Sequence, residues 1–200
     1  MRRLSPGDRL ILATHNESKR REIAELLANT NIEVISASAL NLPEPPEDAP
    51  DFAGNAKIKA LAAAVAANLP AIADDSGFQV AALNGAPGVH SARWAAPNKD
   101  FLPAFARIEA ALAGNPDRRA WFTCVLCQAW PDGETHLFEG RVEGLLTLPP
   151  RGANGFGYDP IFTPAGASLT YAQMSSTEKH LTSHRARALA AWRAAILPPP

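Results

Sequence analysis

The stretch Pro70-Ala71-Ile72-Ala73-Asp74-Asp75-Ser76-Gly77-Phe78 decides the fold, because a short apolar run leads directly into two carboxylates. Residues 70–73 predict a buried strand. The two aspartates then lie at the exit of that strand, where ligands bind in α/β sheets. Adjacent carboxylates repel each other unless a cation or a shared proton relieves the repulsion. The pattern therefore favours a Mg²⁺ site that serves phosphate groups, and the alternative is a helix cap and glycine turn at residues 74–77.

Length and composition predict one domain, residues 1–200, that can have two lobes. The chain has 200 residues, of which 46% are hydrophobic, so it can bury a full core. Its formal net charge of −1 argues against a nucleic acid polymer as the partner. The sequence has no apolar run near the length of a membrane span, about 18 residues, and no apolar stretch follows its first residues. We therefore expect a soluble, cytoplasmic protein without a membrane partner.

The strand and helix patterns alternate along the chain. Apolar runs predict strands at residues 9–13, 33–36, 70–73 and 120–127, with a hairpin around the turn at 131–134. Helices are expected at 17–28, 55–68 and 101–113. Residues 174–197 are expected to be mostly helical, opened by a capping box from Ser175 to Glu178. The acidic, proline-rich residues 42–51 predict a surface loop. This alternation indicates an α/β fold with a mixed sheet.

The two cysteines form a single Cys124-x-x-Cys127 pair. Zinc would need a second pair of ligands, which the sequence does not offer. A spacing of three in a strand places the two sulfurs on opposite faces, so two buried thiols are the favoured interpretation.

Two stretches carry cations at positions suited to phosphate. Thr14-His15-Asn16-Glu17-Ser18-Lys19 joins a strand to a helix, and the free amides of a helix start attract anions. Lys19 would oppose the helix dipole there unless a phosphate accounts for it, and the alternative is a solvated surface lysine. Lys57 and Lys59 begin the alanine-rich helix, and the sequence alone does not separate them.

A glycine-rich loop and the last helix could hold a flat ring. Gly152-Ala153-Asn154-Gly155-Phe156-Gly157-Tyr158-Asp159-Pro160 sets two aromatic residues among three glycines. Such a loop can offer a stacking face, or its aromatic residues can simply pack into the core. Lys179, His184 and Arg185 supply donors for a base edge or a phosphate, or a solvated helix face.

Seven segments, in order from about residue 10 to 190, resemble the Ham1-like family of non-canonical purine nucleoside triphosphate pyrophosphatases, the inosine triphosphatases. The matching segments are Leu12-Ala13-Thr14-His15-Asn16-x-x-Lys19, Phe52-x-x-Asn55-Ala56-x-x-Lys59-Ala60, Ala73-Asp74-Asp75-Ser76-Gly77, Gly85-Ala86-Pro87-Gly88-Val89-His90-Ser91-Ala92-Arg93-Trp94, Phe138-Glu139-Gly140, Arg151-Gly152-x-Asn154-Gly155-Phe156-Gly157-Tyr158-Asp159-Pro160-Ile161-Phe162 and Glu178-Lys179-x-x-x-Ser183-His184-Arg185. No single motif is decisive, but the ordered set is specific and covers nearly the whole chain.

The resemblance implies an elongated, two-lobed α/β fold with a central mixed sheet flanked by helices, a nucleotide cleft between the lobes, and a homodimer. The implied reaction is the Mg²⁺-dependent hydrolysis of ITP, dITP and XTP to the monophosphate and pyrophosphate, which cleanses the nucleotide pool. By matching positions, Asp75 is the expected general base and a metal ligand. The second metal carboxylate is expected to be Glu47, with Glu44 as the alternative.

The resemblance also assigns the substrate contacts. The residues expected at the phosphates are Thr14, His15, Asn16, Glu17, Ser18, Lys19, Lys59 and Ser76. Those expected around the base and sugar are Phe156, Gly157, Tyr158, Asp159, Lys179, His184 and Arg185. Two positions depart from the family pattern, because Gly54 and Gln173 stand where a glutamate is usual.

Three rival functions stay open. A pyrophosphatase of the Maf-like type would share the chemistry but act on pyrimidine or modified nucleotides. A regulatory module would bind nucleotide without turnover. An RNA-binding role is disfavoured by the balanced charge. A donor such as Arg185 would favour bases with a carbonyl at the purine 6-position over adenine, whereas the group that would exclude guanine is not identified.

Overall fold

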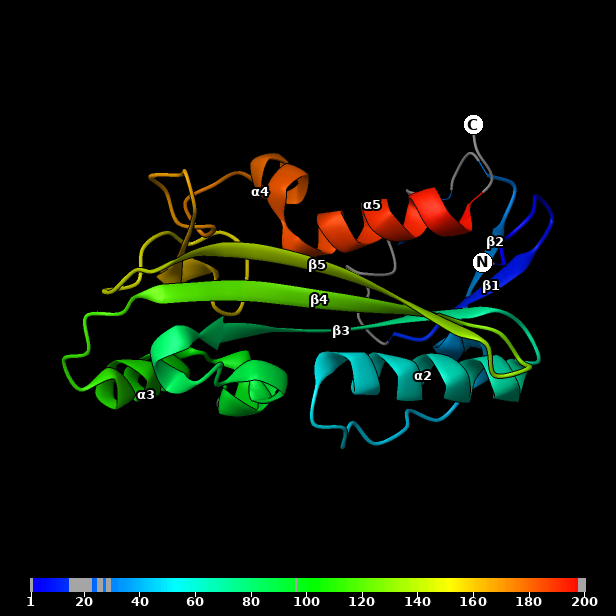
Figure 1. The fold of residues 1–200 in the computed structure, drawn as a ribbon, viewed down its shortest axis with the longest axis horizontal. Coiled ribbons are helices and arrows are strands. Elements are labelled where there is room, and N and C mark those ends of the chain that lie inside the picture. The colour runs from blue at the N-terminus through cyan, green and yellow to red at the C-terminus, as the bar shows by residue number, and fades with distance from the viewer. Residues whose placement is uncertain (1, 15–22, 25–26, 28–29, 96, 198–200) are drawn as a thin grey trace. The chain divides into compact units, whose positions relative to one another are not determined.

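The computed structural model of the chain describes residues 2–14, 23–24, 27, 30–95 and 97–197. Its strands form one six-stranded sheet in the order β2-β1-β3-β4-β5-β6 (Figure 1). β1 runs parallel to β2 and β3, whereas β5 and β6 are antiparallel, which confirms the predicted α/β class with a mixed sheet. The strands are β1 (Arg9–Leu12), β2 (Glu33–Ser36), β3 (Ala71–Val80), β4 (Arg119–Ala129), β5 (Thr135–Leu146) and β6 (Phe162–Pro164).

In the described part of the chain, the α-helices include α2 (Phe52–Ala67), α3 (Leu102–Leu112), α4 (Ser176–Thr182) and α5 (His184–Ile196). Short 3-10 turns occur at Ala37–Leu40, Ala81–Leu83, Gly88–His90, Ala92–Trp94, Pro97–Lys99 and Asp159–Ile161. α2 begins three residues earlier than predicted, because the side chain of Asp51 accepts a hydrogen bond from the amide of Gly54 at 2.7 Å. The predicted helix at 17–28 lies mostly outside the described residues.

The prediction that residues 174–197 are mostly helical is confirmed by α4 and α5, and the structure adds a break between them. Ser183 takes an extended conformation, with ψ at 155°, and separates α4 from α5. The capping box at the start of α4 is confirmed, because Ser175 and Glu178 each bond the other's backbone amide. The break sets His184 and Arg185 at the first turn of a separate helix, α5.

The prediction that Asp74 and Asp75 stand at the exit of a strand is wrong. β3 continues through Ser76 and Gly77 to Val80, so the aspartates lie in its middle and no turn follows them. The apolar residues after the motif, Phe78 and Val80, are fully buried and extend the strand. Their burial outweighs the turn preference of the Asp-Asp-Ser-Gly sequence.

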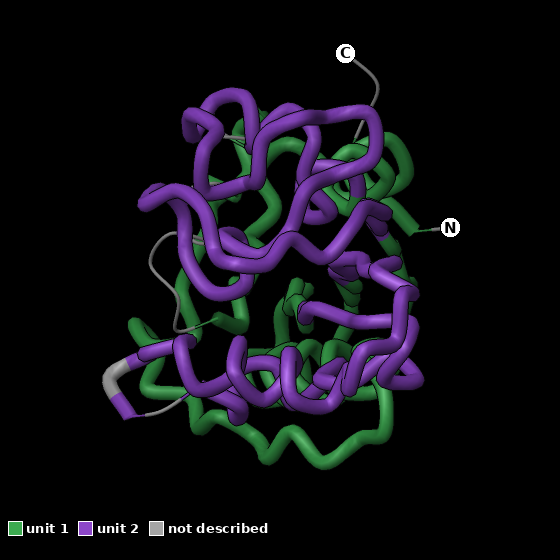
Figure 2. Tube along the Cα trace, turned by 90° about the vertical axis from the view of Figure 1, so that its left-hand side faces the viewer, with its two compact units in different colours: residues 1–75, 125–139, 188–200 green, residues 76–124, 140–187 purple. Residues whose placement is uncertain are grey.

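The chain folds into two compact units, coloured separately in Figure 2. Unit 1 comprises residues 1–75, 125–139 and 188–200, and unit 2 comprises residues 76–124 and 140–187. The boundaries fall inside β3, β4, β5 and α5, so no linker divides the chain into separately encoded domains. That the two units act as one domain stays a prediction.

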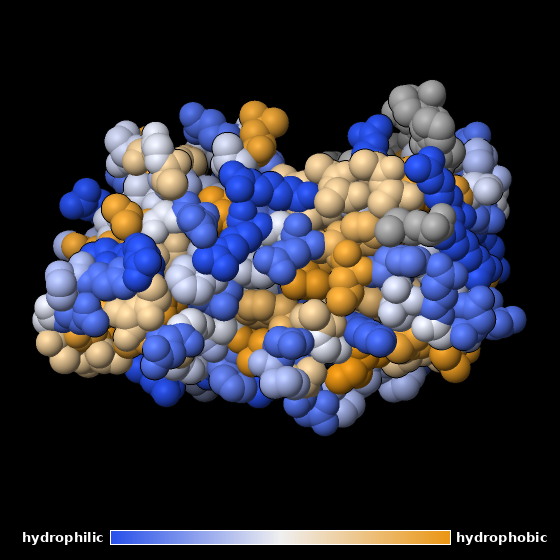
Figure 3. Space-filling view, viewed as in Figure 1, coloured by the Kyte–Doolittle hydropathy of each residue, from blue (hydrophilic) through white to orange (hydrophobic). Residues whose placement is uncertain are grey.

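Unit 1 packs α2 and most of α5 on opposite sides of its strands (Figure 1). Small buried alanines of α2, such as Ala56, Ala60 and Ala64, permit a close approach to the sheet. On α5, the buried indole of Trp192 donates a hydrogen bond to the side chain of Gln128 at 3.0 Å. The alanine-rich surface of α5 appears as a pale apolar area in Figure 3.

Unit 2 has its own aromatic core. Phe78 of β3 contacts the rings of Phe122, Tyr158 and Phe162, with centroid distances of 4.9, 4.9 and 5.9 Å. Ala104, Phe105 and Ile108 of α3 belong to the same buried cluster. The core therefore fixes both the second half of β3 and the end of the glycine-rich loop.

Both cysteines are buried thiols, as predicted. Burial raises the pKa of the Cys127 thiol to about 12, which keeps it protonated and unreactive at neutral pH. In the described ranges no helix is long and apolar enough to cross a membrane. The cytoplasmic location stays a prediction.

Candidate active site

The first candidate cluster lies in unit 1 around the two aspartates of β3. Asp74 and Asp75 are only 7% and 9% exposed. Lys59 of α2 is buried to a similar degree, whereas Lys57 is exposed, so the structure separates the two lysines that the sequence leaves equivalent. Buried carboxylates are costly unless they are paired. The cation that the aspartates require comes from α2.

Lys59 acts as the cation of this cluster. Its Nζ lies 2.6 Å from Oε1 of Glu47, which belongs to the proline-rich loop. Burial by itself lowers the pKa of Lys59. The hydrogen bond to Glu47 and the negative charges of Asp74 and Asp75 outweigh that effect, so the pKa stands above its usual value of 10.5.

Asn55 completes the cluster and was assigned no role from the sequence. It is 1% exposed, and its Nδ2 donates a hydrogen bond to Oδ2 of Asp75 at 2.9 Å. Its Oδ1 accepts a hydrogen bond from the amide of Ala49 at 3.0 Å. The signal that could have found it is a polar side chain between Phe52 and Ala56 on the apolar stripe of an alanine-rich helix.

The oxygen donors of this cluster suit a hard divalent cation. Asp75 and Glu47 both carry carboxylates, the ligands that Mg²⁺ prefers. The ammonium of Lys59 supplies positive charge to these carboxylates. Within the described residues, no three His, Cys, Asp or Glu side chains are already arranged around one point. Glu47 is half-buried and pairs with Lys59, whereas Glu44 is exposed, which favours Glu47 as the second carboxylate.

The second cluster lies in unit 2, around the glycine-rich loop. Asp159 is 2% exposed, and its carboxylate accepts hydrogen bonds from Nζ of Lys179 at 2.5 Å and the amide of Phe156 at 2.8 Å. Burial raises the pKa of Asp159, and the Lys179 charge opposes that effect. Gly155, at φ +74°, has no room for a Cβ against Asp159. Asp159 therefore fixes the conformation of the glycine-rich loop from its buried side.

Phe156 is the exposed aromatic of that loop, with 64% of its surface accessible. The Lys179 ammonium lies 4.4 Å from the centroid of its ring. A cation held at an aromatic face is attracted by the ring quadrupole, which restrains both groups. Phe156 therefore offers a held, exposed face on which a flat ring could stack.

The start of α5 contributes the other predicted donors. The ring of His184 stacks on Phe122 at a centroid distance of 4.9 Å and an interplanar angle of 12°. Nη2 of Arg185 lies 3.4 Å from the hydroxyl of Ser76. Ser76 directly follows Asp75 in β3, so a single peptide bond joins the carboxylate cluster to the residues of unit 2.

Tyr158 has a different setting from Phe156. It is 3% exposed, packs on Phe78, and donates a hydrogen bond from its hydroxyl to the carbonyl of Ser91 at 2.9 Å. The hydroxyl of Ser91 in turn accepts from the amide of Phe78 at 2.8 Å. Tyr158 and Ser91 thus connect the glycine-rich loop to β3 through buried hydrogen bonds. Ser91, the first residue of the Ser-Ala-Arg-Trp motif, therefore has a structural role.

The remaining predicted contacts are only partly visible. Thr14 follows β1 and is half-buried, whereas His15, Asn16, Glu17, Ser18 and Lys19 lie outside the described residues. Gly157 takes a positive φ of 66° beside Phe156. No ligand tests these contacts, so the assigned substrate residues stay predictions.

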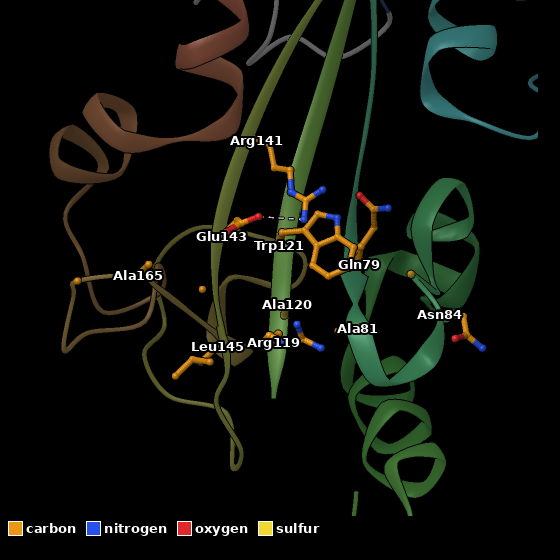
Figure 4. Close-up of a pocket in the computed structure, with 13 residues that line it drawn as sticks. Gln79, Ala81, Asn84, Arg119, Ala120, Trp121, Arg141, Glu143, Leu145 and Ala165 are labelled. Atoms are coloured by element: carbon orange, nitrogen blue, oxygen red, sulfur yellow. Dashed lines mark ion pairs between the residues drawn. The ribbon is translucent and has the colours of Figure 1, made fainter. Parts of the chain in front are cut away.

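A separate cavity of about 880 Å³ lies in unit 2 (Figure 4). Gln79, Trp121, Arg141 and Glu143 line it, and the guanidinium of Arg141 lies 4.3 Å from the Trp121 ring centroid while pairing with Glu143 at 3.0 Å. None of the predicted substrate residues lines this cavity.

Comparisons with known proteins decide the family. The model of the Ham1 family matches residues 10–195, which is nearly the whole chain. The chain belongs to the Ham1 family. Ham1 proteins of known structure share its fold. A HAM1 protein from Coxiella burnetii has a TM-score of 0.87 at 40% identity, covering 92% of this chain and 95% of that one. The Ham1 protein of Staphylococcus aureus gives 0.87 at 37%, covering 94% and 97%.

Two relatives of this Ham1 chain are named dITP/XTP pyrophosphatase. A dITP/XTP pyrophosphatase from Gluconobacter oxydans is 55% identical over 192 residues, which cover 96% of this chain and 92% of the relative. A dITP/XTP pyrophosphatase from Caulobacter vibrioides is 51% identical, covering 95% of this chain and 98% of the relative.

The raised pKa of Lys59 predicts a pH-dependent stability. The ammonium stabilises the folded state fully below its unfolded pKa of about 10.5, and that contribution is lost as the pH rises through the higher folded pKa. We expect Lys59→Met to lower the free energy of unfolding of the metal-free protein by about 2 kcal/mol at pH 8. The difference from wild type should shrink above pH 10.5 in urea titrations.

Lys57→Met is the matched control, because Lys57 lies on the same helix and is exposed. It should change the unfolding free energy little and add no alkaline dependence. An equal effect of both substitutions would show that the carboxylate cluster does not depend on Lys59.

Proposed function

We propose that this chain hydrolyses non-canonical purine nucleoside triphosphates (ITP, dITP and XTP) to the monophosphate and pyrophosphate, with Mg²⁺ as the divalent metal. The observation that carries the proposal is the buried cluster of Asp75, Glu47, Lys59 and Asn55, which concentrates carboxylates at one place. The dITP/XTP pyrophosphatase name of relatives above 50% identity supports the same reaction.

The roles in unit 1 follow from the chemistry of these groups. When bound, Mg²⁺ would be held by Asp75 and Glu47 and would neutralise charge on the phosphate oxygens. Asp75 acts as the general base that removes a proton from the attacking water. Lys59 offers an ammonium to the triphosphate, and Thr14 to Lys19 with Ser76 offer further donors to it.

The roles in unit 2 concern the base. Phe156 supplies the stacking face, and Asp159 and Lys179 hold it. Arg185 carries donors suited to the 6-carbonyl of hypoxanthine or xanthine, which adenine lacks. His184, which precedes Arg185, is buried with its ring stacked on Phe122, and it is the further residue that the resemblance assigns to the base and sugar. Tyr158 and Gly157 would act mainly through the backbone of the loop.

We further propose that residues 1–200 work as one domain and that the protein is a homodimer, as the family resemblance implies. A regulatory module that binds nucleotide without turnover is the rival from another class. A Maf-like preference for pyrimidine or modified nucleotides is the rival within the same chemistry. Substitution of Asp75, the proposed general base, distinguishes hydrolysis from binding without turnover. A comparison of nucleotides distinguishes a purine preference from a Maf-like preference.

Asp75→Asn tests the reaction. The substitution keeps the shape of the side chain but removes the basic oxygen, so we expect kcat for dITP to fall by about 10²- to 10⁴-fold. Nucleotide binding, measured by calorimetry with a non-hydrolysable analogue, should be retained. Asp117→Asn, at a half-buried carboxylate paired with Arg119, is the control and should keep full activity. Normal turnover by Asp75→Asn would contradict the assigned base.

Phe156→Ala tests the stacking face. Loss of the ring should raise the KM for dITP by about tenfold while kcat changes little. The reason is that the ring would stack on the purine equally in the bound substrate and in the transition state. Phe156→Trp should restore the wild-type KM. Leu181→Ala, at an exposed apolar side chain of α4, is the control for a general surface effect. An unchanged KM in Phe156→Ala would remove this residue from the substrate site.

A further inference from the structure

The side chain of Asn55 has a fixed orientation. Its Oδ1 faces the amide of Ala49, a group that can only donate, and its Nδ2 faces the carboxylate of Asp75, which in its ionised form can only accept. A flipped amide would place a donor against a donor and an acceptor against an acceptor. The side chain is 1% exposed, so water does not compete for either contact. Asn55 therefore holds Oδ2 of Asp75 in one direction.

The same amide ties the proline-rich loop to the helix. Ala49 lies two residues after Glu47, and Glu47 is bonded to Lys59 one turn further along α2. Asn55 and Lys59 are separated by four residues, so they share one face of the helix. The loop is thus attached to α2 at two successive turns, next to Asp75.

Gly54 permits this close approach. A Cβ at this position would lie 2.5 Å from Cβ of Ala49 and 3.1 Å from Oδ1 of Asp51. Any side chain here would push the loop away from the helix and lengthen the bond between Ala49 and Asn55. The glycine that departs from the family pattern thus has a local reason, because it lets the loop that carries Glu47 pack directly on α2.

We propose that Asn55 is a positioning residue that orients the carboxylate of Asp75 and links it to the loop of Glu47, so that the base and the second carboxylate are held by one amide. The proposal rests on the proposed function for its catalytic consequence. Among the described residues, the charged groups that interact with Lys59 include Asp75 and Asp74 of β3 and Glu47 of the loop. Asn55 is the neutral member of this set, and it acts through direction rather than charge.

Two substitutions separate the two halves of the amide. Asn55→Leu has a similar shape and removes both hydrogen bonds, whereas Asn55→Asp keeps an acceptor for Ala49 and loses the donor to Asp75. We expect both variants to lower kcat for dITP by about 10- to 100-fold with KM within about threefold of wild type. In hydrogen exchange, the Ala49 amide should lose protection in Asn55→Leu and keep it in Asn55→Asp.

Ala63→Gly is the matched control, because it weakens the same helix at a buried alanine that makes none of the side-chain hydrogen bonds of the cluster. It should lower the melting temperature without changing kcat. Wild-type kcat in Asn55→Asp would overturn the proposal, since the donor to Asp75 would then be dispensable. A loss of kcat in Ala63→Gly as large as in Asn55→Leu would overturn it too, because the effect would be one of general stability. If Asn55→Leu does not fold, Asn55→Asp decides alone.

A measurement without substrate distinguishes failure of this inference from failure of the proposed function. In a double-mutant cycle on the metal-free protein, Asn55→Leu and Asp75→Leu should change the melting temperature non-additively, because each removes a partner of the same bond. Additive changes would overturn the direct contact even if the protein is an active pyrophosphatase. Clear non-additivity in a protein that releases no pyrophosphate would retain the contact and reject the enzymatic function.

Discussion

The burial of negative charge in the middle of β3 is the constraint on which the site depends. Two consecutive aspartates cannot be withdrawn from water inside a strand unless their charge is balanced and their oxygens are bonded. α2 supplies both requirements, with the ammonium of Lys59 and the amide of Asn55. The proline-rich loop then closes on the same helix face through Glu47 and Ala49. Under the proposed function, a divalent metal and the triphosphate would bind at this cluster.

Unit 2 also contains a buried carboxylate that is paired with a lysine. Asp159 is buried in the glycine-rich loop and pairs with Lys179 of α4. In the same way, the charge of Asp75 is balanced in part by Lys59 of α2. Because Asp159 also bonds the amide of Phe156, the exposed ring is fixed from within rather than by its own packing. The pairing of an inner carboxylate with an outer aromatic suits a site that must recognise a flat base repeatedly and in one orientation.

The sequence predicts the fold class well, because alternating apolar runs and well-marked caps are local signals. β2 has the predicted bounds, and the capping box of Ser175 and Glu178 is confirmed. The length of β3 was not predictable from the Asp-Asp-Ser-Gly motif, whose turn preference is overridden by the burial of Phe78 and Val80 in the core of unit 2. The sequence does not predict the break at Ser183 for a similar reason. Serine is compatible with a helix, and only the tertiary structure selects its extended form.

The candidate site was predictable in its residue types and only partly in its geometry. The motifs identify Asp75, Lys59 and Phe156, but spacing alone cannot show that Asn55 bonds Asp75 from 20 residues away in sequence. Nor could it show that Tyr158 is buried while Phe156, two residues earlier, is exposed. Such distinctions depend on which side of a loop meets the core, and that is decided by residues distant in the chain.

Release of pyrophosphate from a panel of nucleotides tests the central claim most directly. The wild-type protein would be assayed with dITP, ITP, XTP, dATP, GTP and dTTP, each with and without Mg²⁺, and the pyrophosphate and monophosphate products would be quantified. The account predicts metal-dependent release from dITP, ITP and XTP and little from the others. Rapid release from dTTP, or activity that does not require a divalent metal, would contradict it.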